Sequence, residues 1–173
     1  KLYDVEQSIQ KMLEYDEKIK NAADKIKDSE SMFYLGRGLD YVIAVEGALK
    51  SKEISYIHSE AFASGELKHG TIALITDGVP VVVNVTQSGL FEKSVSNIKE
   101  VTSRGAYVIA IAKEGNTVVE EVADEVFYIP DVEDDYAGFP TIVIHQLLAY
   151  YLSKLKGNDV DKPRNLAKSV TVE

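Results

Sequence analysis

Residues 79–85 read VPVVVNV, and residues 106–112 read AYVIAIA. In both stretches apolar residues occupy consecutive positions, so both sides of a pleated strand would be apolar. Strands of this kind are buried on both faces, as in a parallel sheet that is covered by helices. The two stretches therefore predict an α/β fold with a parallel sheet at its centre.

Helical and extended segments alternate around these two strands. Two further strands are expected at Met32–Leu35 and Glu125–Ile129. Helices are expected from Asp40 through roughly Glu53, near Leu90–Ser103, and from about Phe139 to Leu155. Asp40 could cap the first of these helices. This alternation predicts a doubly wound, mostly parallel sheet flanked by helices.

The first 30 residues carry an amphipathic helical pattern. Apolar residues recur there at helical spacing, namely Val5, Ile9, Met12, Leu13, Ile19, Ala22, Ala23 and Ile26. Such a stripe has to be buried, so residues 1–30 are expected to form one or two helices that pack on a domain of residues 31–173. Docking of this stripe on a domain outside the chain is the alternative. Because the chain starts at Lys1 instead of methionine, we expect a piece of a longer protein or a processed product.

Length and composition exclude several classes of protein. The 173 residues suffice for one domain with a sizeable core. The net charge of −9 disfavours nucleic acid or an anionic membrane as the main partner, and no apolar run is long enough to span a bilayer. The chain contains no cysteine, which excludes disulfides, thiolate metal sites and a cysteine nucleophile.

Residues 113–136 are strongly acidic, with Lys113 as the one basic residue beside nine acidic residues. The carboxylates are scattered and do not follow the spacing of a calcium-binding loop. We therefore interpret this segment as a solvated surface and predict no metal site in it.

The turn Gly36-Arg37-Gly38 follows the first expected strand and precedes a helix. Backbone N–H groups of such a turn, together with the helix N-terminus, can bind a phosphate. Two glycines do not complete the dinucleotide-binding fingerprint, which needs a third glycine and an acidic residue further on. A phosphate site and a simple tight turn are therefore equal alternatives at this position.

Glu46, Lys50 and Glu53 share one face of the expected helix, because they are spaced i, i+4 and i+7. An exposed Glu–Lys ladder, with a few tenths of a kcal/mol per pair, is the simpler interpretation. The alternative is a carboxylate held beside an ammonium group for proton transfer. Gly47 lies inside the same helix, where glycine costs about 1 kcal/mol and often permits the close approach of a neighbour.

Three histidines and the polar tail supply the remaining candidates. His69, in the loop GELKHG, is expected to be exposed and able to transfer protons near neutral pH. His58 and His145 are expected to be structural, His145 as a packing residue in the apolar stretch TIVIHQLLAY. In the tail, Arg164 suits a phosphate and Lys168 suits an imine, although a frayed chain end is the simpler interpretation.

Three separated motifs resemble those of the isomerizing glutamine–fructose-6-phosphate aminotransferases. The motifs are FYLGRG (33–38), EGALKSKEISYIHSEAFASGELKHG (46–70) and DKPRNLAKSVTVE (161–173). They occur in the order of that family, and the resemblance covers the chain from about Met32 onward. It implies that residues 31–173 form the second of two sugar-isomerase (SIS) domains and that residues 157–173 form a catalytic tail.

The resemblance implies an enzyme that converts fructose 6-phosphate and glutamine-derived ammonia into glucosamine 6-phosphate without a cofactor. Glu53 would be the general base that moves a proton between C1 and C2 of the sugar, and Lys50 would assist hydroxyl proton transfer. Lys168 would form an imine with the open-chain sugar. His69 would help to open the sugar ring of the neighbouring subunit in a homodimer. The implied substrate-binding residues are Glu46, Arg164 and Ala167.

The chain also departs from the pattern of this family. Thr71 follows KHG where the family commonly has proline, which bears on the rigidity of the loop. Without a cysteine the chain holds no glutaminase domain, and Thr86-Gln87-Ser88-Gly89 is a poor match to the phosphate loop of a first SIS domain. We therefore expect full activity to require a first SIS domain, together with either a glutaminase domain or ammonia. The resemblance also implies a cytoplasmic location.

Two alternative functions stay open. One is a non-catalytic phosphosugar-binding module, such as the sensing domain of a transcription regulator, which would need a DNA-binding helix-turn-helix. Residues 1–30 carry six basic against eight acidic residues, and this acidic balance disfavours DNA binding. A related phosphosugar isomerase or deglycase would share the fold, which alone does not separate these functions. Lys168 discriminates among them, because a pure binding module needs no imine-forming lysine.

Overall fold

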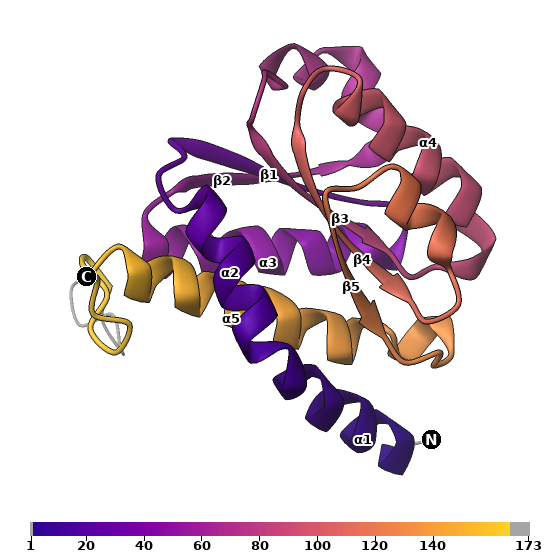
Figure 1. Cartoon of the computed structure of the whole chain (residues 1–173), viewed down its shortest axis with the longest axis horizontal. Coiled ribbons are helices and arrows are strands. Elements are labelled where there is room, and N and C mark those ends of the chain that lie inside the picture. Colours follow the sequence, from indigo (N-terminus) through magenta and orange to yellow (C-terminus); the bar gives the residue numbers. More distant parts are fainter. Residues whose placement is uncertain (1, 167–173) are drawn as a thin grey trace, which may run out of the picture.

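A five-stranded parallel sheet forms the centre of the molecule (Figure 1). The structure is a computed structural model and describes residues 2–166. The strands are β1 Ser31–Gly36, β2 His58–Ala63, β3 Pro80–Val85, β4 Tyr107–Lys113 and β5 Glu125–Ile129. All neighbouring strands are parallel, in the spatial order β2-β1-β3-β4-β5. The winding reverses between β1 and β3, which is the topological switch point of a doubly wound sheet.

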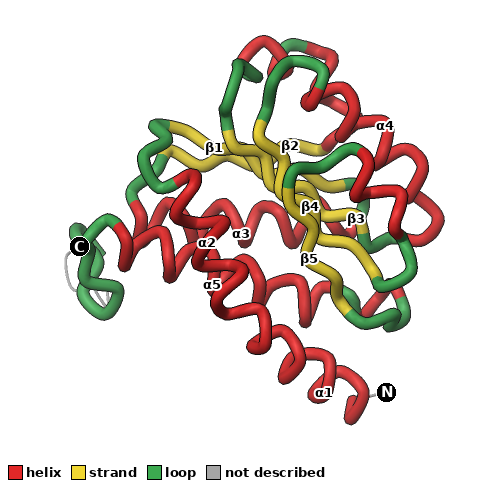
Figure 2. Tube along the Cα trace, in the orientation of Figure 1, coloured by secondary structure: helices red, strands yellow, loops and turns green. Residues whose placement is uncertain are grey.

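Helices cover both faces of this sheet (Figure 2). They are α1 Leu2–Met12, α2 Asp16–Ile26, α3 Leu39–Ser55, α4 Phe91–Thr102 and α5 Gly138–Leu155. Helices α1, α2, α3 and α5 share one core with one face of the sheet, whereas α4 packs with several 3-10 turns on the other face. The predicted doubly wound α/β fold is therefore confirmed.

The two apolar stretches form β3 and β4 in the middle of the sheet. Every residue of β3 is buried, as is every residue of β4 except Tyr107. Val81 and Val83 belong to the core under α4, while Val82 between them belongs to the core that holds α3 and α5. The consecutive apolar residues are thus explained by two buried faces.

The N-terminal segment crosses α5 (Figure 1). A 3-10 turn at Leu13–Tyr15 joins its two helices. The buried residues of this segment include Met12 of α1 and Ile19, Ala22, Ala23 and Ile26 of α2. The apolar stripe of the amphipathic pattern is therefore covered by the sheet domain of the same chain.

Strand β2 has no counterpart among the strands expected from the sequence. It reads HSEAFA and lies at the edge of the sheet, paired with β1 alone. Only Ser59 in it is buried, and the remaining positions are partly or fully exposed. An edge strand of this composition shows neither an apolar run nor an alternating pattern, so periodicity does not reveal it.

Asp40 does not cap α3, contrary to the expectation from the sequence. The helix begins at Leu39, with Gly38 at its N-cap position. The Asp40 carboxylate instead accepts hydrogen bonds from the backbone N–H and the hydroxyl of Thr86, at 2.8 and 2.5 Å, just after β3. Gly36 permits this tight turn, because a Cβ there would lie 2.3 Å from the backbone of Asp40. Burial raises the pKa of Asp40, and its hydrogen bonds fasten α3 to β3 at the switch point.

Candidate active site

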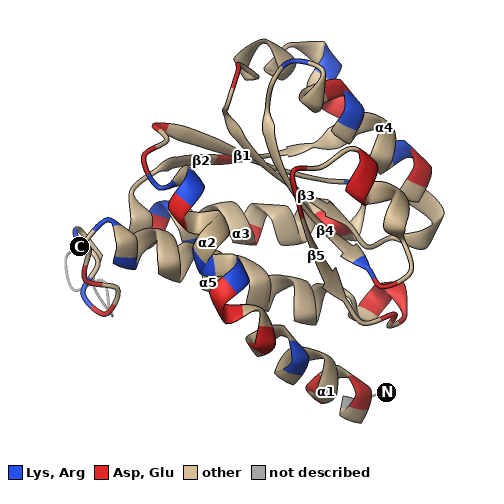
Figure 3. Cartoon of the chain, viewed as in Figure 1, with Lys and Arg blue, Asp and Glu red and all other residues tan. Residues whose placement is uncertain are grey.

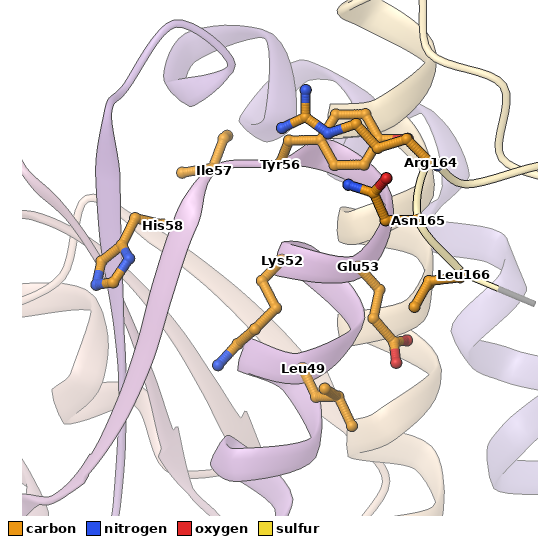
Figure 4. Close-up of a pocket in the computed structure, with 9 residues that line it drawn as sticks. All are labelled: Leu49, Lys52, Glu53, Tyr56, Ile57, His58, Arg164, Asn165 and Leu166. Carbon is orange, nitrogen blue, oxygen red and sulfur yellow. The ribbon is translucent and has the colours of Figure 1, made fainter. Parts of the chain in front are cut away.

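A pocket of about 500 Å³ lies at the C-terminal end of α3, where β2 begins and the last described residues return (Figure 4). Its lining residues are Leu49, Lys52, Glu53, Tyr56, Ile57, His58, Arg164, Asn165 and Leu166. Two residues singled out in the sequence, Glu53 and Arg164, are far apart along the chain and meet at this pocket. The pocket is therefore the place where the helix motif and the tail motif come together.

Lys50 is held between two carboxylates on α3. Its Nζ lies 3.3 Å from Glu46 Oε1 and 3.0 Å from Glu53 Oε2. The shared helix face predicted from the spacing of these residues is therefore present. All three side chains are partly exposed, so the two ion pairs contribute little to folding stability. Their arrangement is better suited to a role in proton transfer at the adjoining pocket.

The hydrogen bond to Glu53 raises the pKa of Lys50 above its ordinary value. Lys50 therefore stays protonated at neutral pH, where it can donate a hydrogen bond or a proton but cannot act as a base. Of the two carboxylates beside Lys50, Glu53 is the one that lines the pocket.

The tail is attached to the residue that follows α3. Arg164 stacks on Tyr56, with its Cζ 4.0 Å from the ring centroid, and its backbone N–H donates to the Tyr56 hydroxyl at 3.0 Å. Figure 4 shows the guanidinium lying over the ring. Ala167 and Lys168, which were singled out in the same motif, lie outside the described residues.

His69 lies far from this pocket within one chain. It ends the 3-10 turn Ser64–His69, beyond the C-terminal end of β2, whereas Glu53 lies before the start of that strand. A strand of six residues such as β2 spans about 20 Å. The His69 side chain is 72% exposed, and its Nδ1 lies 3.3 Å from Glu66 Oε2. A single chain therefore does not bring His69 and Glu53 together.

His58 differs from its expected structural role. Its side chain is 68% exposed at the pocket wall, and its Nε2 lies 3.7 Å from Glu60 Oε2. Tyr56 is a second pocket residue that sequence reasoning missed. The signal available for both was their place inside the EGALKSKEISYIHSEAFASGELKHG motif.

His145 is fully buried in α5, as expected of a packing residue. Its Nε2 lies 3.0 Å from Asn84 Oδ1, while its Nδ1 has no hydrogen-bond partner among the described residues. The ring packs against Gly47 of α3, where a Cβ would lie 2.8 Å from the imidazole Cγ. Gly47 thus permits the close approach suggested by its position inside a helix. Burial lowers the pKa of His145 to about 3.

The neutral imidazole of His145 predicts a fold that loses stability in mild acid. The unfolded chain protonates His145 below about pH 6.5, but the folded ring resists protonation down to about pH 3. Stability therefore falls as the pH drops through this window, by up to about 1.4 kcal/mol per pH unit. Urea denaturation of the wild type and of His145→Phe between pH 7 and pH 5 measures both slopes. The Phe variant should show the shallower slope, and equal slopes would contradict this prediction.

Carboxylates from other parts of the chain accept hydrogen bonds from the turn that follows β3. Ser88 donates from its backbone N–H and its hydroxyl to Asp134, at 2.9 and 2.8 Å. The Asp134 carboxylate also lies 2.5 Å from the ammonium of Lys113, whose side chain is only 5% exposed. Burial alone would raise the pKa of Asp134, but the hydrogen bonds from Lys113 and Ser88 outweigh it and hold that pKa below its ordinary value.

Lys113 and Asp134 therefore differ from the solvated surface predicted for residues 113–136. Together with Asp40 on Thr86, Asp134 accepts backbone N–H bonds at the carboxyl ends of the strands. This edge is where ligands commonly bind in open α/β sheets. Because these carboxylates already accept the N–H bonds that a phosphate would need, the turn after β3 is a closed turn and not an open phosphate site.

Charges of both signs are interspersed along α1, α2 and α4 (Figure 3).

Within residues 2–166, no three His, Cys, Asp or Glu side chains are grouped so that they could hold a metal ion. In the same part of the chain, no helix combines the length and the apolar composition needed to cross a membrane.

The family model described as the SIS domain matches residues 25–155. The chain belongs to the SIS domain family. The matched residues run from α2 to the end of α5, so this SIS domain includes the face formed by Glu46, Lys50 and Glu53.

Relatives of this SIS domain include two curated proteins named glutamine–fructose-6-phosphate aminotransferase (isomerizing). The one from Caldanaerobacter subterraneus subsp. tengcongensis is 56% identical over 165 residues, which cover 95% of this chain and 27% of the relative. The one from Clostridium acetobutylicum is 60% identical over 157 residues, which cover 91% of this chain and 26% of the relative. This chain therefore spans about a quarter of the length of these relatives.

A solved structure supports the same relationship. It is the C-terminal domain of glucosamine-fructose-6-phosphate aminotransferase from Francisella tularensis, with a TM-score of 0.86 and 38% sequence identity. The match covers 93% of this chain and 45% of that chain. The resemblance drawn from the three sequence motifs is thereby confirmed.

Proposed function

We propose that this chain is the second SIS domain of an isomerizing glutamine–fructose-6-phosphate aminotransferase and carries acid–base and imine-forming groups of its isomerase site. The reaction converts fructose 6-phosphate and glutamine-derived ammonia into glucosamine 6-phosphate. The observation that carries the proposal is the Lys50 ammonium fixed between Glu46 and Glu53, beside a pocket that the tail also lines. The identity with the two named relatives supports it.

Glu53 is the proposed general base. A shift between ketose and aldose moves a proton between C1 and C2, and one carboxylate within reach of both carbons can remove and return it. Lys50 is the neighbouring acid, because it stays protonated and can donate to a hydroxyl oxygen of the sugar. The pair offers a base and an acid side by side on one rigid helix.

The tail would contribute the amine nucleophile. Leu166 lines the pocket, and Lys168 stands two positions further along the sequence. A chain spans at most about 3.6 Å per residue, so this short connection keeps Lys168 within reach of the pocket. Its neutral amine would condense with the C2 carbonyl of open-chain fructose 6-phosphate, forming an imine and releasing water. The proposed substrate-binding residues remain Glu46, Arg164 and Ala167.

His69 is proposed to act from a second copy of the chain. Because β2 separates His69 from Glu53, ring opening by His69 at this pocket requires the histidine of a partner subunit. The exposure of His69 is consistent with this role, since an imidazole that serves another subunit has to lie on the surface. A homodimer would therefore hold two composite sites.

The sugar phosphate is proposed to be held mainly by a domain outside this chain. Asp40 and Asp134 already accept the backbone N–H bonds of the turn after β3. A first SIS domain would supply the phosphate site and a glutaminase domain would supply ammonia, in keeping with the greater length of the relatives. The resemblance to this family also supports a cytoplasmic location.

A chimeric enzyme tests the proposed function. In it, this chain replaces the matching segment of the Clostridium acetobutylicum relative. We expect the chimeric enzyme to form glucosamine 6-phosphate from fructose 6-phosphate and ammonia within about tenfold of the parent rate. Binding without turnover would instead favour a sugar-phosphate-binding module, and ketose–aldose interconversion without amino-sugar formation would favour a related isomerase. A folded chimeric enzyme with neither property would refute the proposal.

A further inference from the structure

The chain beyond α5 is bonded to the C-terminal end of α3 at two points. The side-chain amide of Asn158 donates to the backbone carbonyls of Ile54 and Ser55, at 3.1 and 3.5 Å. The second point is the stack and hydrogen bond between Arg164 and Tyr56. The final carbonyls of a helix lack partners within the helix, so Asn158 satisfies groups that would otherwise need water. Both points hold the tail against the end of the helix that carries Glu53.

Tyr56 has an unusual backbone conformation for its residue type. It follows α3 with φ of 61° and ψ of 14°, in the left-handed region. Glycine is the usual residue at such a helix end, because a side chain raises the energy of this conformation. An aromatic residue in a strained conformation at a pocket is a sign that the side chain itself is needed. The partner of that side chain is Arg164, through both the ring and the hydroxyl.

We propose that Tyr56 is the residue that positions the C-terminal tail over the pocket. The ring fixes the Arg164 guanidinium, and the hydroxyl fixes the Arg164 backbone, so that Asn165 and Leu166 form part of the pocket wall. Tyr56 thereby sets the starting point from which the chain continues to Lys168. This inference rests on the proposed function of Lys168, but the attachment of the tail can be measured without any activity.

The substitution Tyr56→Gly separates a positioning role from a structural one. Glycine removes the ring and the hydroxyl but relieves the strain of the left-handed conformation, so the fold should be at least as stable to heat as the wild type. Tyr56→Phe retains the stack and removes only the hydrogen bond to Arg164. Tyr150→Leu is the matched control, because Tyr150 is a partly exposed tyrosine of α5 that packs on Tyr151.

Limited trypsin digestion of the chain itself reports on the attachment. Trypsin cleaves chain segments that are free to enter its active site, so release of this segment from Tyr56 should speed cleavage of the Arg164–Asn165 bond. Mass spectrometry quantifies the fragment that ends at Arg164. We expect cleavage at this bond to be about tenfold faster in Tyr56→Gly, a few-fold faster in Tyr56→Phe, and unchanged in Tyr150→Leu. An unchanged rate in Tyr56→Gly would overturn the proposal.

Kinetics of the chimeric enzyme report on function. Tyr56→Gly should lower kcat at least tenfold and change the KM for fructose 6-phosphate less than about threefold, since the tail is misplaced while the other binding groups remain. Tyr56→Phe should recover most of the lost kcat. Faster cleavage combined with an undiminished kcat would overturn the positioning role. If the wild-type chimeric enzyme is itself inactive, the proposed function fails, while the digestion still decides whether Tyr56 holds the tail.

Discussion

Replacing Glu53 with glutamine in the chimeric enzyme is expected to lower kcat by about 10³-fold and to leave the KM for fructose 6-phosphate within a few-fold of its wild-type value. The amide keeps the size of the side chain and can still accept a hydrogen bond from Lys50. It cannot take up a proton from C1 of the sugar. The loss should therefore fall on the chemical step and spare binding. Steady-state measurement of amino-sugar formation with ammonia as the nitrogen donor gives both constants.

Glu92→Gln provides the matched control for this substitution. Glu92 is an exposed glutamate in the first turn of α4, on the opposite face of the sheet from α3, so the Glu92→Gln enzyme should have the kcat of the wild type.

Hydrogen exchange gives a second test of Glu53. In the Glu53→Gln enzyme, loss of the proton acceptor should stop exchange of the C1 hydrogen of the sugar with deuterated solvent. A Glu53→Gln enzyme that keeps its kcat within about threefold, or that exchanges this hydrogen normally, would remove Glu53 from the role of general base.

Mixing two inactive variants is expected to restore activity, if His69 serves the neighbouring subunit. The variants are Glu53→Gln and His69→Ala of the chimeric enzyme. After subunit exchange of an equal mixture, half of the dimers are mixed, and each mixed dimer holds one site with both wild-type residues. The mixture should therefore recover about a quarter of the wild-type activity, far above either variant alone. The distance along β2 between His69 and Glu53 is the structural reason for this expectation.

The double variant Glu53→Gln/His69→Ala mixed with wild type is the control for subunit exchange. In those mixed dimers each of the two sites lacks one of the residues, so this mixture should retain about a quarter of the wild-type activity, from the wild-type homodimers alone. Size-exclusion chromatography with two distinguishable tags confirms that exchange has taken place. Exchange without any recovery in the mixture of single variants would show that His69 does not act across subunits.

The centre of the fold could be predicted from the sequence because it is buried on both sides. Continuous apolar runs at β3 and β4 leave little alternative to a covered parallel sheet, and the helices around them carry clear boundaries. The edge strand β2 could not be predicted, since its partial exposure permits a mixed composition. Hydrogen bonds between residues far apart along the chain could not be predicted from the sequence either. The Asp40 side chain has the residue type of a helix cap, but its partner is Thr86, which lies far along the chain.

The candidate site could be predicted in part. Helical spacing was enough to place Glu46, Lys50 and Glu53 on one face, because those contacts are local. The meeting of this face with the tail was suggested only by the family resemblance. Tyr56 was missed because its importance lies in a strained backbone and in a contact with Arg164, and neither is visible as a sequence pattern.

Trapping of the imine tests the central claim most directly. The chimeric enzyme is incubated with fructose 6-phosphate, reduced with borohydride, digested and examined by mass spectrometry. We expect a sugar-phosphate adduct on Lys168 that is absent from the Lys168→Arg variant, since reduction converts an imine into a stable secondary amine. If the enzyme binds fructose 6-phosphate but no adduct forms on Lys168, the tail does not carry the nucleophile. The proposal that this SIS domain carries the imine-forming group of the isomerase site is then contradicted.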